Sequence, residues 1–350
     1  NSRNFWCNVK GIGSWSLTGH SAEELSKKFT EMQDDSEVTA GFMWQKTTRE
    51  SKKYQLRGEI LSFIPVDKNV EIMLVTITNT GRMAQTVTPT AAIPLYGRSA
   101  DNIRDHRHVT SLLHRIETTD TGVLVTPTLS FDERGHQVNH MTYYCVGWSG
   151  NGEKPVDFYP TAEDFVGEGG NFERPYAIVK NAEGVKAGTK IEGLEAVGGL
   201  HFSEITLEPE EECSYLIFTG ITEDIQEIRN LSKTYTTREK VLEELEKTKA
   251  YWQEKVNVAY HTGDSDFNQF MHWVSFQPIL RRIYGCSFLP HHDYGKGGRG
   301  WRDLWQDCLA LLIMNPDGVR QMLLDNFAGV RIDGSNATII GSKQGEFVAD

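Results

Sequence analysis

The chain has 350 residues, which is enough for one large domain or two. Its 36 basic and 48 acidic side chains give a net charge of −12, which disfavours nucleic acid as a partner. No apolar run approaches the roughly 20 residues that a membrane helix needs, so no membrane partner is expected. The five cysteines are scattered and include no CxxC pair, which favours a cytoplasmic protein without disulfides or a structural metal site.

The N-terminal part of the chain is predicted to form strands. Turn residues separate runs that are rich in β-branched and aromatic side chains, at 71–81, 86–93, 122–127, 141–147 and 214–220. No long amphipathic helix lies between these runs. The pattern predicts a large antiparallel β-sandwich over residues 1–221.

The composition changes near residue 222. Acidic residues follow Thr222 as in the first turn of a helix, and Glu, Lys and Leu dominate up to residue 258, which predicts a helical linker over 222–258. Beyond it, helices are expected from Phe267 to about Tyr284 and from Asn315 to Phe327. Pro278 would kink or divide the first of these two helices, because proline lacks the N–H that continues a helix.

Residues 298–307, with the sequence GRGWRDLWQD, form the densest group of polar and aromatic side chains. On a helix, Asp303 and Asp307 share a face one turn apart. Buried charges are costly unless they are paired or used, so we expect Arg302 and both aspartates to be buried together at the floor of a polar pocket. An internal ion pair that only pins the helix is the alternative. The glycine-rich run 295–300 favours a ligand, because glycine lets the backbone approach one closely.

These features resemble a known family, the inverting phosphorylases of glycoside hydrolase family 94. The resemblance covers the whole chain in domain order and is most specific at residues 298–307, with support from residues 11–16 (GIGSWS) and the strand at 70–80. Together with residues 341–346 (GSKQGE), the motif is most similar to 1,2-β-oligoglucan phosphorylases; cellobiose, cellodextrin and chitobiose phosphorylases are relatives.

The resemblance implies a multidomain β and α protein. An antiparallel super-sandwich and a helical linker would be followed by the beginning of an (α/α)6 barrel, incomplete over residues 259–350. Five residues would bind the substrate. Arg302 and Asp303 would be ligands of the glucosyl unit, and Arg299, Gln306 and Asp307 would contact the sugar or its ligands. Charge-assisted hydrogen bonds from such groups strengthen as the sugar ring flattens towards the transition state.

The reaction that the resemblance implies is reversible, inverting phosphorolysis of β-glucosidic oligosaccharides, with 1,2-β-glucooligosaccharides such as sophorose as the closest substrates. Inorganic phosphate would attack the anomeric carbon and give α-glucose 1-phosphate, without a cofactor or a metal. The enzyme would be a homodimer. The resemblance also implies that the general acid lies beyond residue 350, in a later segment of the barrel. Asp303 and Asp307 are not expected to replace it, because carboxylates paired with an arginine are poor acids near neutral pH.

Other functions stay open: a cellobiose- or cellodextrin-type phosphorylase, a hydrolase or an α-glucoside phosphorylase on the same fold, and a carbohydrate-binding protein without activity. Four further segments are less informative. Residues 291–293 (HHD) are a weak chelate, and residues 104–108 (RDHRH) are typical of a solvated surface or an interface. Residues 167–172 follow no strand–helix pattern and are not expected to be a phosphate-binding P-loop, whereas residues 343–346 are candidates to line a pocket.

Overall fold

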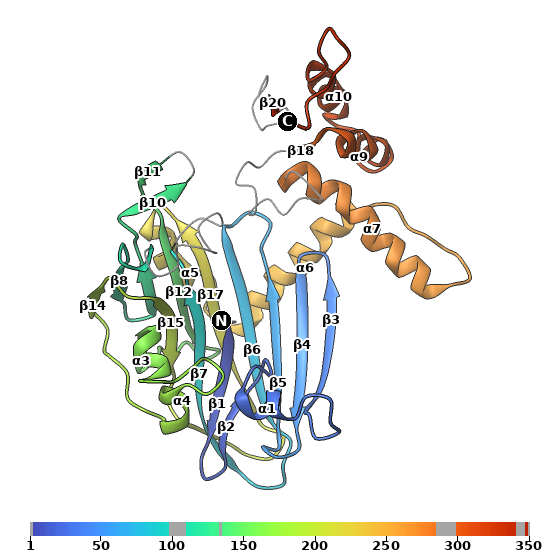
Figure 1. Cartoon of the computed structure of the whole chain (residues 1–350). Helices are drawn as coiled ribbons and strands as arrows, with labels where there is room; N and C mark the ends of the chain where they lie inside the picture. The colour runs from blue at the N-terminus through green and yellow to red at the C-terminus, as the bar shows by residue number, and fades with distance from the viewer. Residues whose placement is uncertain (1–2, 98–109, 133–134, 285–298, 341–346, 349–350) are drawn as a thin grey trace. The chain divides into compact units, whose positions relative to one another are not determined.

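The computed structural model describes residues 3–97, 110–132, 135–284, 299–340 and 347–348. The chain divides into two compact units, residues 1–248 and 249–350 (Figure 1). The first unit holds the large sheets and the second holds helices with a small sheet. The composition indicates domain boundaries at residues 221 and 258, and these boundaries stay a prediction.

Two antiparallel sheets form the first unit (Figure 1). Within the described residues, the six-stranded sheet has the order β13-β15-β7-β1-β2, with β16 paired to β7. Its strands are β1 (Asn4–Val9), β2 (Gly13–Ser16), β7 (Gln85–Leu95), β13 (Asp157–Thr161), β15 (Ala196–His201) and β16 (Ile205–Leu207). This sheet contains the strand predicted at 86–93.

The nine-stranded sheet, counted over the same residues, has the order β14-β8-β9-β12-β17-β6-β5-β4-β3. Its strands are β3 (Asp35–Gly41), β4 (Trp44–Ser51), β5 (Leu56–Phe63), β6 (Val70–Asn79), β8 (Arg115–Thr118), β9 (Gly122–Val125), β12 (Thr142–Ser149), β14 (Lys190–Glu192) and β17 (Glu212–Thr222). A separate hairpin pairs β10 (Leu129–Asp132) with β11 (Gly135–Val138). The predicted antiparallel super-sandwich is confirmed.

The core explains why β6 contains the unbroken apolar run 72–75. Successive side chains of a strand point to opposite faces of its sheet. Met73 and Val75 face the core shared by the two sheets, with Phe5 of β1. Ile72 and Leu74 face a second apolar cluster on the other side of the nine-stranded sheet. Because both faces of β6 are buried, apolar residues occupy four consecutive positions, 72–75.

Helices cover the outer faces of the sandwich. Ile228 of α5 (Ile225–Thr234) and Val241 of α6 (Arg238–Lys255) pack against the nine-stranded sheet. Phe165 of α3 (Ala162–Val166) and Ile178 of α4 (Tyr176–Lys180) pack against the six-stranded sheet. A short helix, α1 (Ala22–Ser26), begins at the capping residue Ser21. The residues predicted as a helical linker therefore pack on the sandwich in their first half.

The second unit contains α7 (Ser265–Tyr284), α9 (Trp301–Met314) and α10 (Val319–Ala328), with a small sheet of β18 (Arg299–Gly300), β19 (Ile339–Ile340) and β20 (Phe347–Val348). The helix α7 continues through Pro278, so it is not divided there. The ring of Phe276 packs on Trp252 with centroids 5.2 Å apart. In the part of the chain that the structure describes, no helix is long and apolar enough to cross a membrane.

Candidate functional site

The predicted site residues lie where a strand leads into a helix. The strand β18 pairs with β19, and α9 begins directly after it, at Trp301. The Trp301 backbone N–H donates to the Thr338 carbonyl at 3.0 Å, which fixes the first turn of α9 against the segment before β19. Arg299 pairs with Ile340 through its backbone, and its side chain lies outside the described part of the structure.

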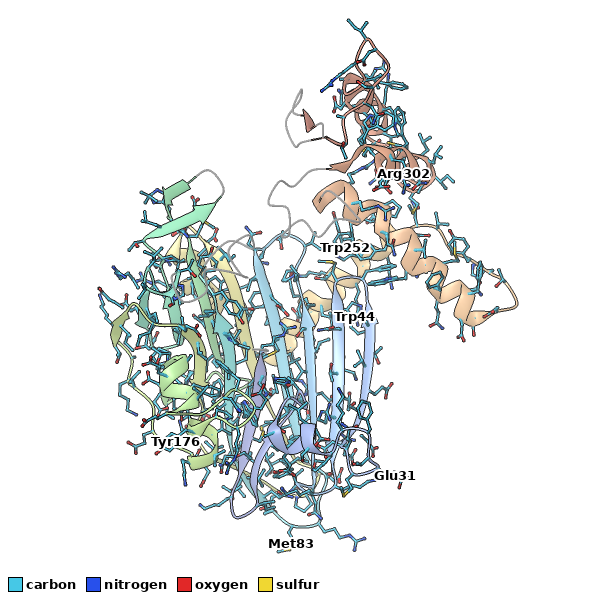
Figure 2. All side chains as sticks on the ribbon, viewed as in Figure 1. Glu31, Trp44, Met83, Tyr176, Trp252 and Arg302 are labelled. Atoms are coloured by element: carbon cyan, nitrogen blue, oxygen red, sulfur yellow. The ribbon has the colours of Figure 1, made fainter. Side chains whose placement is uncertain are left out.

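Arg302 projects from the first turn of α9 and its side chain is 77% exposed (Figure 2). Its Nε and Nη2 atoms each lie 3.3 Å from Asp303 Oδ1. The expectation that Arg302 is buried with the aspartates is wrong, because this position of the helix faces solvent. Gln306, one turn further on, is exposed as well, so the two residues offer donors on an open surface.

Asp307 is buried, with 4% of its surface exposed, and its partner is Arg281 of α7. Arg281 Nε lies 2.8 Å from both Asp307 oxygens, and its Nη2 atom also contacts Oδ1. Gln277 accepts a hydrogen bond from Arg281 Nη1 at 3.3 Å. The ion pair that pins a helix therefore exists at Asp307, but its cation is Arg281 and not Arg302.

Arg281 is a residue that sequence reasoning missed. The signal for it was the pair Arg281-Arg282 in the last turn of α7. Cations at that end of a helix are favoured by the helix dipole alone, so the pattern did not identify a partner. Arg282 has a different partner: its Nη2 atom donates a hydrogen bond to the Asn315 carbonyl at 3.2 Å.

Aromatic side chains join α9 to α10 beside this site. The rings of Trp301 and Trp305 meet edge to face with centroids 5.6 Å apart, as their spacing of one helical turn predicts. Trp305 also packs edge to face on Phe327 of α10, at 4.6 Å. Trp301 Nε1 donates to the Asn326 carbonyl at 3.0 Å, so indole contacts join α9 to α10.

This arrangement can bind a polyhydroxylated or anionic ligand through exposed donors and one partly exposed carboxylate. The described residues include no group of three or more His, Cys, Asp or Glu side chains that could hold a metal ion. Residues 291–293, 104–108 and 343–346, which the sequence singles out, lie outside the described residues. Gly167 ends α3 at φ 74°, so residues 167–172 follow a helix C-terminus and do not form a P-loop.

Comparisons with known proteins place the chain among carbohydrate-active proteins. Residues 13–238 match the supersandwich domain of glycosyl hydrolase 94. Over 194 residues the chain is 26% identical to the cyclic beta-(1,2)-glucan synthase NdvB of Rhizobium meliloti (strain 1021), a match that covers 54% of this chain and 6% of that protein. This chain therefore corresponds to a small part of the synthase.

Among solved structures, a bacterial glucoamylase complexed with acarbose has the same fold, with a TM-score of 0.55 at 10% identity. The likeness covers 99% of this chain and 47% of the glucoamylase, so it extends from the sandwich into the helical unit. It supports the predicted order of a super-sandwich followed by helices of an (α/α)6 barrel. Since the family match spans more than half of the 350 residues, the chain belongs to glycoside hydrolase family 94.

Proposed function

We propose that this protein cleaves β-glucosidic oligosaccharides by inverting phosphorolysis, as a homodimer and without a cofactor. The proposed substrates are 1,2-β-glucooligosaccharides such as sophorose, and the products are α-glucose 1-phosphate and a shortened glucan. Family membership and the relative named for β-(1,2)-glucan support a carbohydrate substrate with this linkage. The observation that carries the proposal is the exposed guanidinium of Arg302 beside Asp303 at the start of α9.

Arg302 and Asp303 are proposed to bind the glucosyl unit. The two 3.3 Å contacts between them are long for charge-assisted hydrogen bonds, which are usually about 2.7–2.9 Å. The exposed guanidinium can therefore turn to sugar hydroxyls at little cost. Hydrogen bonds of this kind accelerate the reaction if they shorten as positive charge develops on the sugar ring.

Asp307 is not proposed as the general acid. A general acid must present a proton to the glycosidic oxygen, at hydrogen-bond distance. Both oxygens of Asp307 accept hydrogen bonds from Arg281, and the side chain is buried, so it cannot reach a glycosidic oxygen. Phosphate is the nucleophile in this reaction, so a carboxylate base, which an inverting hydrolase needs to activate water, is not required.

The test uses the product of the complete gene. It is incubated with inorganic phosphate and, separately, with sophorose, laminaribiose, cellobiose or diacetylchitobiose, and α-sugar 1-phosphate is assayed. Phosphate-dependent product from sophorose alone is the expected result. Product from another disaccharide would support phosphorolysis but would assign a different glycosidic linkage to the substrate. Free sugar without sugar phosphate would indicate a hydrolase, and glucan binding without any product would indicate a carbohydrate-binding protein.

A further inference from the structure

The helix α9 carries Arg302 in its first turn but begins without a side-chain cap. A helix usually starts after a residue whose side chain accepts a hydrogen bond from the first turn. The residue before α9 is Gly300, which has no side chain to do this. Because helix ends fray more easily than helix centres, contacts from outside the helix decide how firmly this turn is held.

Trp301, the first residue of α9, is held from outside the helix at three points. Its backbone N–H donates to the Thr338 carbonyl at 3.0 Å. Its own carbonyl accepts a hydrogen bond from Asn326 Nδ2 at 3.4 Å, and its indole Nε1 donates to the Asn326 carbonyl at 3.0 Å. Asn326 of α10 therefore fixes both the backbone and the ring of the residue that precedes Arg302.

The side chain of Asn326 is polar at a position where packing alone would favour an apolar one. Asn326 is 0% exposed, and its Oδ1 atom has no hydrogen-bond partner within the described residues. A buried oxygen without a partner is unfavourable, and an apolar side chain would avoid this cost. The opposite orientation of the amide would bring Oδ1 against the Trp301 carbonyl oxygen, so it is disfavoured. What the amide contributes is its N–H group towards Trp301.

We propose that Asn326 is a positioning residue for sugar binding, which acts through Trp301 on Arg302. Its amide keeps the first turn of α9 in place, so the exposed guanidinium meets the sugar from a fixed backbone. Displacement of a binding group by about 1 Å can cost two orders of magnitude in rate. Asn326 is buried and does not touch the sugar itself. The role rests on the proposed binding of the glucosyl unit by Arg302.

The experiment is a double-mutant cycle in the product of the complete gene. It compares kcat/KM for phosphorolysis of sophorose in the parent, Asn326→Ala, Arg302→Ala and the double variant. In the parent, Asn326→Ala should lower kcat/KM about five- to tenfold, roughly the effect of one lost hydrogen bond. In the Arg302→Ala background it should change kcat/KM by less than about twofold, because the group that it positions is gone.

Asn257→Ala is the matched control. The Asn257 amide donates to the Met314 carbonyl at 3.0 Å, at the opposite end of α9, so kcat/KM should stay within about twofold of the parent. Hydrogen–deuterium exchange, followed by mass spectrometry, is the second readout. Asn326→Ala should speed exchange in peptides that cover residues 301–308, and the control should not. Trp301→Phe removes the indole N–H, has the same expected effects, and serves if Asn326→Ala does not fold.

Three results would overturn the positioning role. They are equal losses of kcat/KM in the two backgrounds, an equal loss in Asn257→Ala, and unchanged exchange over residues 301–308. If the parent yields no sugar phosphate, the proposed phosphorolysis fails by itself, and the cycle is run on the dissociation constant for sophorose. The same non-additivity is expected there, and a parent that does not bind sophorose would overturn the positioning role as well.

Discussion

The guanidinium of Arg281 holds both carboxylate oxygens of Asp307, with Nε 2.8 Å from each. The two residues are 26 positions apart and lie on α7 and α9, so the contact ties one helix to the other. Only 5% of the Asp307 side chain is exposed, and water therefore screens the pair weakly. Asp307 is therefore a residue that positions α9, and Arg302 and Asp303 lie in the first turn of the same helix.

We expect Asp307→Asn to lower the free energy of unfolding by about 3 kcal/mol, because removing one partner leaves a buried charge uncompensated. Urea titration followed by circular dichroism measures this loss. Asp317→Asn is the control, because Asp317 is exposed, and its value should stay within about 0.5 kcal/mol of the parent. Equal values for the two variants would show that the Arg281–Asp307 pair does not stabilise the helical unit.

Arg302→Ala should lower the activity without lowering the stability of the fold. The side chain is exposed, so the free energy of unfolding should change by less than about 0.5 kcal/mol. Loss of a charged ligand of the glucosyl unit should lower kcat/KM for phosphorolysis by about ten- to a hundredfold. Arg320→Ala, at an exposed position of α10, should leave both quantities unchanged. Unaltered kinetics in Arg302→Ala would show that Arg302 does not bind the glucosyl unit.

Glu23 of α1 should make stability depend on acid pH. Partial burial raises the pKa of this carboxyl, but hydrogen bonds from Lys53, Lys27 and Tyr54 outweigh it and lower the pKa from 4.5 to about 2. Because the pKa is lower in the folded state, the stabilisation is complete above pH 4.5 and is lost as the pH falls to 2. Solvent screens this partly exposed cluster, so we expect only about 1 kcal/mol.

The measurement for Glu23 compares the parent with Glu23→Gln in urea titrations between pH 7 and pH 2.5. The parent should be more stable at pH 7, and the difference should shrink as the pH falls through the acid range. A difference that is independent of pH would mean that the carboxylate charge does not stabilise α1.

Gly122, at the start of β9, should not tolerate a side chain. A Cβ atom there would lie 2.1 Å from the Cys145 carbonyl oxygen of β12, and backbone cannot move away as a flexible side chain can. Gly122→Ala should therefore cost about 1–3 kcal/mol in the free energy of unfolding. At Gly263, a Cβ would meet no described atom within 4 Å, so Gly263→Ala is the control and should be near neutral. Equal melting temperatures would contradict the prediction.

The five strand runs that the sequence singles out correspond to β6, β7, β9, β12 and β17, because the alternation and β-branched content of a strand are local properties. The strands β3, β4 and β5 were not singled out. The apolar run that predicts a strand at 71–81 is β6, and the one-turn spacing of Trp301 and Trp305 is a ring contact in α9. Continuation of α7 through Pro278 was not predictable, because packing of Phe276 and Ile279 outweighs one lost backbone hydrogen bond.

Partners and burial were decided only by the tertiary structure. The sequence places Arg302 and Asp307 near each other and gives no reason to prefer the more distant Arg281 as the cation. It also gives no sign that the Asn326 amide meets the Trp301 carbonyl, because the two residues lie on different helices. A charge or an amide acquires its role from the elements that pack around it, and the packing of distant segments leaves no periodic pattern in the chain.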